Sequence, residues 1–251
     1  MTASRVEFEA RLRQIGADRY HDKHPFHQLL HSGGCTPDQV RAWVINRYAY
    51  QAAIPMKDAA FMSRVDDPKL RRAWRSRIED HDGTDQNEGG IERWLRLADA
   101  VGLDRDYVAS KEGILPATTF AVDAYVRFVR DRTLLEAVAA SLTELFAPKI
   151  HADRIKGLLA NYAFADDRSL SYFRNRLNEA PKDVAFGLAW VLDHADTGEK
   201  QDAAAKALIF KTDVLWAQLD ALHAAYVEPA RRPPGAWEPG THLRIEQAQA
   251  S

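Results

Sequence analysis

Residues 36–55 read TPDQVRAWVINRYAYQAAIP, and this stretch decides the fold class. Pro37 follows Thr36, and proline is favoured in the first turn of an α-helix. Apolar side chains then recur every three or four residues as far as Ile54, and Pro55 indicates the end of the helix. The stretch therefore predicts a long α-helix.

The same helical spacing recurs along nearly the whole chain. No series of alternating β-branched strands with turn dipeptides between them interrupts it. In the first segment, Ser4 and Glu7 have capping-box spacing. The sequence therefore predicts an all-α fold, a compact helical bundle. The other expected helices cover residues 4–15, 68–81, 90–101, 117–131, 133–146, 148–160, 167–195 and 200–227.

Proline and glycine predict where this pattern is interrupted. Pro25 breaks the His-rich segment 21–31, and Pro181 is expected to kink or split its helix, because proline removes a hydrogen bond of the helical ladder. Proline and glycine crowd the chain near its C-terminus, which predicts a tail on the surface or on a partner subunit. We expect a single all-α catalytic domain over 1–228 and a Pro/Gly-rich C-terminal tail over 229–251.

Composition excludes several classes of function. The 251 residues include 34 Lys and Arg against 36 Asp and Glu, so neither a nucleic-acid nor a membrane-surface partner is expected. The single cysteine, Cys35, excludes an intrachain disulfide and a thiolate zinc or iron–sulfur site within one chain. The chain shows neither the apolar core of a signal peptide nor an 18-residue apolar run. A soluble cytoplasmic protein is the expectation.

Several helices place charged or titratable side chains on the stripe that should face the core. Arg47 and Gln51 continue an apolar stripe, and Arg77 lies one turn before His81. Taken singly, such a residue snorkels, pairs with a neighbour or packs as a core aromatic. Buried charges nevertheless cost several kcal/mol unless they are paired. Together these residues predict an enclosed cationic pocket for a small ligand with several carboxylates.

Metal and nucleotide chemistry find little support. The spacing of His21, His24, His27 and His31 could place imidazoles on one helical face, but Pro25 interrupts the segment. No Glu-x-x-His pair of the di-iron type occurs in the chain. Phosphate-loop, dinucleotide-fold and nucleophile-elbow signatures are also missing. We therefore expect no metal site.

Eight runs of sequence carry a resemblance to a known family. They are YHDKHPFH at 20–27, WVINRYAYQAAIPMKDAA at 43–60, DHDG at 80–83, GGIERWLRL at 89–97, FAVDAY at 120–125, SLTELFAPKIH at 141–151, YFRNRL at 172–177 and FKTDVLW at 210–216. In this order they resemble the pyrroloquinoline-quinone synthase family, over nearly the whole chain. The resemblance implies the compact all-α fold of haem oxygenases and TenA proteins, usually assembled as a homodimer.

The resemblance also implies the final step of pyrroloquinoline quinone (PQQ) biosynthesis. A bicyclic quinone precursor (AHQQ), a polycarboxylate, undergoes ring closure and an eight-electron oxidation by O₂. Hydrogen peroxide is released and PQQ is the product. O₂ is a co-substrate, and the family uses no metal or organic redox cofactor. A carrier protein of the PQQ pathway is a candidate partner.

Matched position by position, the family's site residues fall into two groups. His81, Tyr172 and Arg176 resemble the group that holds O₂ or peroxide beside the substrate, and together with His151 they form the predicted catalytic set. The predicted substrate-binding residues are His21, Arg47, Tyr50, Gln51, Arg77, Tyr125, Glu144, Arg154 and Lys211.

Three other functions stay open from the sequence. A TenA-like thiaminase or aminopyrimidine hydrolase would need a nucleophilic cysteine late in the chain, whereas Cys35 is early. A haem-binding or haem-degrading protein would use a histidine of segment 21–27 as its proximal ligand, and haemin would then give a Soret shift. A helical adaptor or ligand-binding protein would form a complex without turnover.

Overall fold

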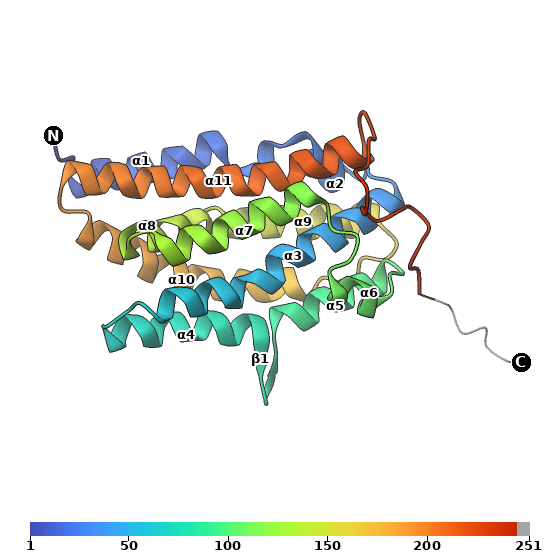
Figure 1. The fold of residues 1–251 in the computed structure, drawn as a ribbon, viewed down its shortest axis with the longest axis horizontal. Helices are drawn as coiled ribbons and strands as arrows, with labels where there is room; N and C mark the ends of the chain where they lie inside the picture. The colour runs from blue at the N-terminus through green and yellow to red at the C-terminus, as the bar shows by residue number, and fades with distance from the viewer. Residues whose placement is uncertain (245–251) are drawn as a thin grey trace, which may run out of the picture.

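The computed structural model describes residues 1–244, except for the side chains of residues 178–184. It is a helical bundle whose long helices lie roughly along the longest axis of the molecule (Figure 1), so the predicted all-α fold is confirmed. The elements are α1 (Arg5–Arg19), η1 (His21–Lys23), α2 (Pro25–Ser32), α3 (Pro37–Met62), α4 (Pro68–Asp82), β1 (Gly83–Thr84), β2 (Asn87–Glu88), α5 (Gly90–Ala100), α6 (Arg105–Ser110), α7 (Pro116–Asp131), α8 (Leu134–Ala140), η2 (Ser141–Leu145), α9 (Ala147–Asn161), α10 (Ser171–His194) and α11 (Gly198–Tyr226).

The predicted starts of the first two long helices are confirmed by their caps. At α1 the backbone N–H of Ser4 donates to Glu7 Oε2 at 2.8 Å, and the Glu7 N–H donates back to Ser4 Oγ at 3.3 Å. At α3 the Thr36 hydroxyl accepts from the N–H of Gln39, and Pro37 occupies the first turn. These pairs satisfy backbone donors that have no partner within the helix.

The predicted end of the third helix at Pro55 is wrong, because α3 continues through this proline to Met62. A proline inside a helix costs one backbone hydrogen bond. Tertiary packing offsets that cost here, since Ile54 and Phe61 on either side of it are buried against neighbouring helices. Lys57 and Asp58 therefore belong to the same helix as Arg47.

The helix predicted over 133–146 is also wrong in part. α8 ends at Ala140, a 3₁₀ turn follows as η2, and α9 begins at Ala147. Pro148 prevents one continuous α-helix from α8 into α9, because its ring would clash with the carbonyl of Glu144. The short helix α6 and the two-residue strands β1 and β2, paired antiparallel, were not predicted.

Two large hydrophobic clusters and a small one around Tyr20 fill the described part of the bundle. One large cluster contains Trp43, Trp94 and Phe173, and the other contains Phe61 and Trp74. Among the described residues, no helix is long and apolar enough to cross a membrane. The predicted split at Pro181 is wrong, because α10 continues through this proline from Ser171 to His194.

The C-terminal segment packs on its own chain. Trp237 is only 1% exposed and joins the first hydrophobic cluster. Its backbone N–H donates to the carbonyl of Gly113 at 2.9 Å, and its carbonyl accepts from the Tyr226 hydroxyl at 2.9 Å. The expectation of a tail on the surface or on a partner is therefore wrong at Trp237. The last seven residues of the predicted tail, 245–251, lie outside the described residues.

Candidate active site

The structure brings the predicted site residues together around one cavity inside the bundle. Twelve of the thirteen line it, and they come from η1, α3, α4, α7, η2, α9 and α10: His21, Arg47, Tyr50, Gln51, Arg77, His81, Tyr125, Glu144, His151, Arg154, Tyr172 and Arg176. The thirteenth, Lys211 of α11, lies behind two of them. Its Nζ is 2.6 Å from Tyr50 Oη and 3.6 Å from the centre of the Tyr125 ring.

Sequence reasoning missed some residues that also line the cavity. Lys57 is 2% exposed and follows Ile54 by three positions on α3, so both reach the same cavity. It was missed because the helix was predicted to end at Pro55. The helical stripe, extended by one turn, would have found it. Tyr20 and Thr143 lie outside regular α-helices, where no stripe marks them.

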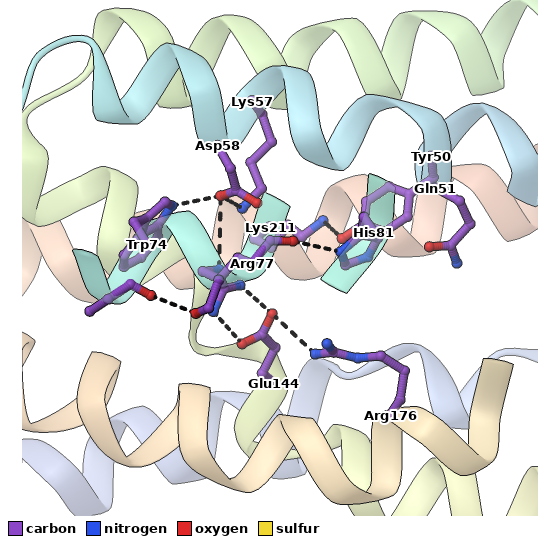
Figure 2. A network of polar contacts seen from close by, with 12 residues as sticks. Tyr50, Gln51, Lys57, Asp58, Trp74, Arg77, His81, Glu144, Arg176 and Lys211 are labelled. Carbon is purple, nitrogen blue, oxygen red and sulfur yellow. Dashed lines mark hydrogen bonds and ion pairs between the residues drawn. The ribbon is translucent and has the colours of Figure 1, made fainter. Parts of the chain in front are cut away.

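A set of alternating cations and carboxylates forms what we call the paired wall: Lys57, Arg77, Glu144 and Arg176, which line the cavity, and Asp58 behind them (Figure 2). Arg77 donates to both carboxylate oxygens of Glu144, with the NH1 to Oε2 bond at 2.9 Å. Arg176 NH2 lies 3.7 Å from Glu144 Oε1. Glu144 thereby connects α4 with α10.

The paired wall keeps its carboxylate ionised. Burial alone would raise the pKa of Glu144, but Arg77 and Arg176 outweigh burial and hold the pKa at about 2. Glu144 is therefore a permanent counter-ion at neutral pH. It cannot act there as a general acid.

Three further cations form what we call the unpaired wall: Arg47 and Arg154, which line the cavity, and Lys211, which lies behind Tyr50 and Tyr125. None of the three forms an ion pair with a carboxylate among the described residues. Aromatic faces support them instead, with the Arg47 guanidinium 4.1 Å from the centre of the Tyr50 ring. Burial and the neighbouring Arg47 lower the pKa of Arg154 to about 10, and burial with Arg47 lowers the pKa of Lys211 well below its ordinary value. An anionic ligand would relieve this repulsion.

Two histidines orient the Arg154 guanidinium. Its Nε donates to His31 Nε2 at 3.1 Å, and NH2 lies 3.4 Å from His27 Nδ1. A guanidinium can only donate, so both imidazole nitrogens accept and carry no proton. Gly157 allows α9 to approach α2 this closely, because a Cβ there would lie 2.5 Å from the carbonyl oxygen of His31. Among the described residues, no group of three or more His, Cys, Asp or Glu side chains could hold a metal.

His81 presents a neutral imidazole to the cavity. Its Nδ1 lies 3.0 Å from the backbone carbonyl of Arg77, which can only accept, so Nδ1 carries the proton. Nε2 keeps a lone pair and has no hydrogen-bond partner among the described residues. Burial and Arg176 lower the pKa of His81 to about 4. Nε2 is therefore a free base at neutral pH.

Two other predicted catalytic residues, His151 and Tyr172, line the cavity with their ring centres 6.4 Å apart. Burial and Arg154 lower the pKa of His151 well below its ordinary value, so this imidazole is neutral as well. The Tyr172 hydroxyl donates to Gln51 Oε1 at 2.9 Å. The cavity can thus offer proton acceptors and hydrogen-bond donors side by side.

Cys35 does not reach the cavity. It is 6% exposed, and its backbone N–H donates to the Tyr162 hydroxyl. Burial raises the pKa of its thiol to about 11, so the thiolate is scarce at neutral pH. The alternative function that needs a nucleophilic cysteine lacks one among the residues lining the cavity.

The fold and the site define the class of all-α bundle proteins with a cationic internal cavity. Within that class, the TENA/THI-4/PQQC family pattern matches residues 9–221, and the chain belongs to this family. It is 74% identical over 234 residues to the pyrroloquinoline-quinone synthase of Rhizobium meliloti, covering 93% of this chain and 91% of that protein.

Two further similarities extend this assignment. The chain is 58% identical over 247 residues to the bifunctional coenzyme PQQ synthesis protein C/D of Methylorubrum extorquens, covering 98% of this chain and 66% of that protein. A domain of unknown function from Shewanella denitrificans, with a haem-oxygenase-like fold, superposes with a TM-score of 0.75. That match covers 95% of this chain and all of the other at 13% identity, and it confirms the predicted fold alone.

Proposed function

We propose that this chain is a pyrroloquinoline-quinone synthase, an enzyme of PQQ biosynthesis. Family membership and the 74% identical relative of that name support the proposal. The observation that carries it is the composition of the cavity walls. Five cationic side chains and one carboxylate line the cavity, so a ligand with several carboxylates would balance the charge.

The proposed reaction is ring closure and eight-electron oxidation of the bicyclic quinone precursor, with O₂ as electron acceptor and PQQ as product. Each O₂ that becomes H₂O₂ accepts two electrons and two protons, all of which the precursor can supply. We propose that neither a metal nor an organic cofactor takes part. The four guanidinium groups that line the cavity suit anions. Among the described residues, no group of three or more His, Cys, Asp or Glu side chains, the three imidazoles of the cavity included, could hold a metal.

The proposed catalytic residues divide proton transfer from charge stabilisation. Nε2 of His81 has a free lone pair, so it would accept a proton released from the precursor, and His151 would act in the same way. Arg176 would stabilise superoxide or peroxide by charge, and the Tyr172 hydroxyl would turn from Gln51 to donate its hydrogen bond to reduced oxygen. The neutral state of both imidazoles makes them bases in the unliganded protein.

The proposed substrate-binding residues fix the carboxylates and quinone oxygens. Arg47, Arg154 and Lys211 are suited to carboxylates because their charges have no counter-ion among the described residues. Arg77 would bind a carboxylate or quinone oxygen of the precursor, while Glu144 holds the Arg77 guanidinium in place. The neutral members of the set, His21, Tyr50, Gln51 and Tyr125, would contact the rings and oxygens between these charges.

An oxygen-uptake assay with the quinone precursor tests this function. Metal-stripped protein should consume O₂, release H₂O₂ and produce the absorbance spectrum of PQQ. His81→Asn should bind the precursor normally and accumulate an intermediate, because the variant lacks the basic nitrogen. Absence of both turnover and peroxide from the wild-type protein would contradict the function. Full turnover by His81→Asn would contradict the role of that residue alone.

We also propose a homodimer and a pathway carrier protein as partners. The fused C/D protein of Methylorubrum extorquens supports the second proposal, since this chain covers only 66% of it. Light scattering during size-exclusion chromatography should give the mass of two chains. A cytoplasmic location stays a prediction.

A further inference from the structure

Asp58 does not line the cavity, yet it holds residues that do. It is completely buried on α3. Its Oδ1 accepts from Lys57 Nζ at 2.5 Å and from Trp74 Nε1 at 2.6 Å, and it lies 3.9 Å from Arg77 Nε (Figure 2). One carboxylate oxygen thus joins α3 to two side chains of α4.

The charge of Asp58 supports the charge of Lys57. Burial lowers the pKa of the Lys57 ammonium, Asp58 raises it, and Arg77 lowers it further. Asp58 is the carboxylate in direct contact with this ammonium. Without that carboxylate, Lys57 would be a buried cation next to Arg77. Its neutral, unprotonated form would then be more populated.

Asp58 also fixes the Arg77 guanidinium from a second side. Glu144 binds NH1 and NH2, while Asp58 faces Nε. The Arg77 guanidinium lies over the Trp74 ring, 4.8 Å from its centre, and the hydrogen bond to Asp58 holds that ring in place. Two carboxylates from different elements and one aromatic face therefore determine where Arg77 points.

Stability alone gives a weak reason for this arrangement. A buried ion pair is often no more stable than well-packed apolar residues of similar volume. Apolar groups are available nearby, because Phe61 packs against Trp74 with ring centres 4.3 Å apart. Oδ2 of Asp58 also has no hydrogen-bond partner among the described residues, which a purely structural network would avoid.

We propose that Asp58 is a positioning residue of the reaction, which keeps Lys57 charged and Arg77 aimed into the cavity so that both bind an anionic part of the quinone precursor. This inference rests on the proposed function. Asp58 acts through two cations that line the cavity, and it touches no substrate itself.

Steady-state kinetics of Asp58→Asn at saturating O₂ test the proposal. Asparagine keeps the shape and an oxygen for Trp74 Nε1 but removes the charge. The KM for the precursor should rise about tenfold, while kcat changes less than threefold. The matched control is Asp196→Asn, which removes an exposed carboxylate paired with Lys200 and should leave KM unchanged. A structural defect would instead lower the amount of folded enzyme and leave KM as it is.

Each outcome decides between the two proposals. Absence of turnover by the wild-type enzyme overturns the proposed function and this inference with it. Turnover with an unchanged KM in Asp58→Asn overturns the positioning role alone. If Asp58→Asn does not fold, Trp74→Phe replaces it, because it removes one hydrogen bond to Asp58 and keeps every charge. This variant should raise KM about threefold, and an unchanged KM contradicts the proposal.

Discussion

The paired and unpaired walls of the cavity each contain three cations, but they support these charges in different ways. In the paired wall, Asp58 and Glu144 lie between Lys57, Arg77 and Arg176. In the unpaired wall, aromatic rings and neutral imidazoles take the place of carboxylates. In the first wall every cation has a carboxylate partner before any ligand arrives, whereas the cations of the second wall have no carboxylate partner among the described residues.

This difference indicates separate tasks for the two walls. Carboxylates fix the cations of the paired wall in one geometry, so they can orient a ligand precisely where it reacts. Buried cations without counter-ions destabilise the protein when no ligand is bound. They bind an anionic ligand more strongly than cations that already have a carboxylate partner. A polycarboxylate ligand that completes the unpaired wall should therefore stabilise the fold.

The largest effect is expected from breaking the paired wall. Arg77→Met leaves Asp58 and Glu144 without their shared cation, and the loss of one partner from a buried ion pair costs about 3–5 kcal/mol. Urea denaturation should show this decrease in the free energy of unfolding. Arg19→Met is the control, because its ion pair with Asp213 is exposed and contributes at most about 1 kcal/mol. Equal stability of the two variants would contradict the description of the paired wall.

A substitution in the unpaired wall should lower the affinity for PQQ without lowering the stability of the fold. Arg154→Met removes a buried guanidinium that has no carboxylate partner among the described residues, so the melting temperature should stay the same or rise. Affinity for PQQ should fall about 30-fold, since a lost charge-assisted hydrogen bond costs about 2 kcal/mol. Thermal melts without ligand and a spectroscopic titration with PQQ measure the two quantities. A loss of stability as large as that of Arg77→Met would remove the distinction between the walls.

The same comparison shows what the sequence could predict. Helical periodicity placed Arg47, Arg77 and Arg154 on inward faces, and all three line the cavity. The resemblance to a family added His21 and implied the roles. The other predicted residues also came from the periodicity: Tyr50, Gln51, His81, Tyr125, Glu144, His151, Tyr172, Arg176 and Lys211. Neither source could tell which cations have carboxylate partners, because Arg77 and Glu144 are far apart in the chain and meet only through packing.

The errors have local physical causes. Proline in the middle of a helix looks like a helix end, so Lys57 and Asp58 were lost from the stripe beyond Pro55. Tertiary packing overrode that local preference. Trp237 lies in a segment rich in proline and glycine, and composition gave no sign that its ring completes a hydrophobic cluster. Such long-range contacts are not encoded in any short stretch.

The smallest expected effect concerns the response of the two walls to acid. His31 accepts a hydrogen bond from Arg154 of the unpaired wall. Burial and the charge of Arg154 lower the pKa of His31 to about 3. The ordinary pKa of histidine is about 6.5, so the unfolded chain binds a proton here at a higher pH than the folded chain does. Stability from this residue is complete above about pH 6.5 and is lost as the pH falls towards 3. In the paired wall, Glu144 has a pKa of about 2, so its contribution is lost only below its ordinary value of 4.5.

The variant His31→Gln therefore isolates the effect of acid on the hydrogen bond that orients Arg154. Glutamine can still accept this hydrogen bond, but it does not titrate. Between pH 6.5 and 5.5, the wild-type protein should lose up to about 1 kcal/mol more of its free energy of unfolding than the variant. Urea melts at both values of pH measure the difference, and the other buried histidines contribute equally to both proteins. If the two proteins lose the same stability, His31 is protonated when folded, and it cannot then be the acceptor that orients Arg154.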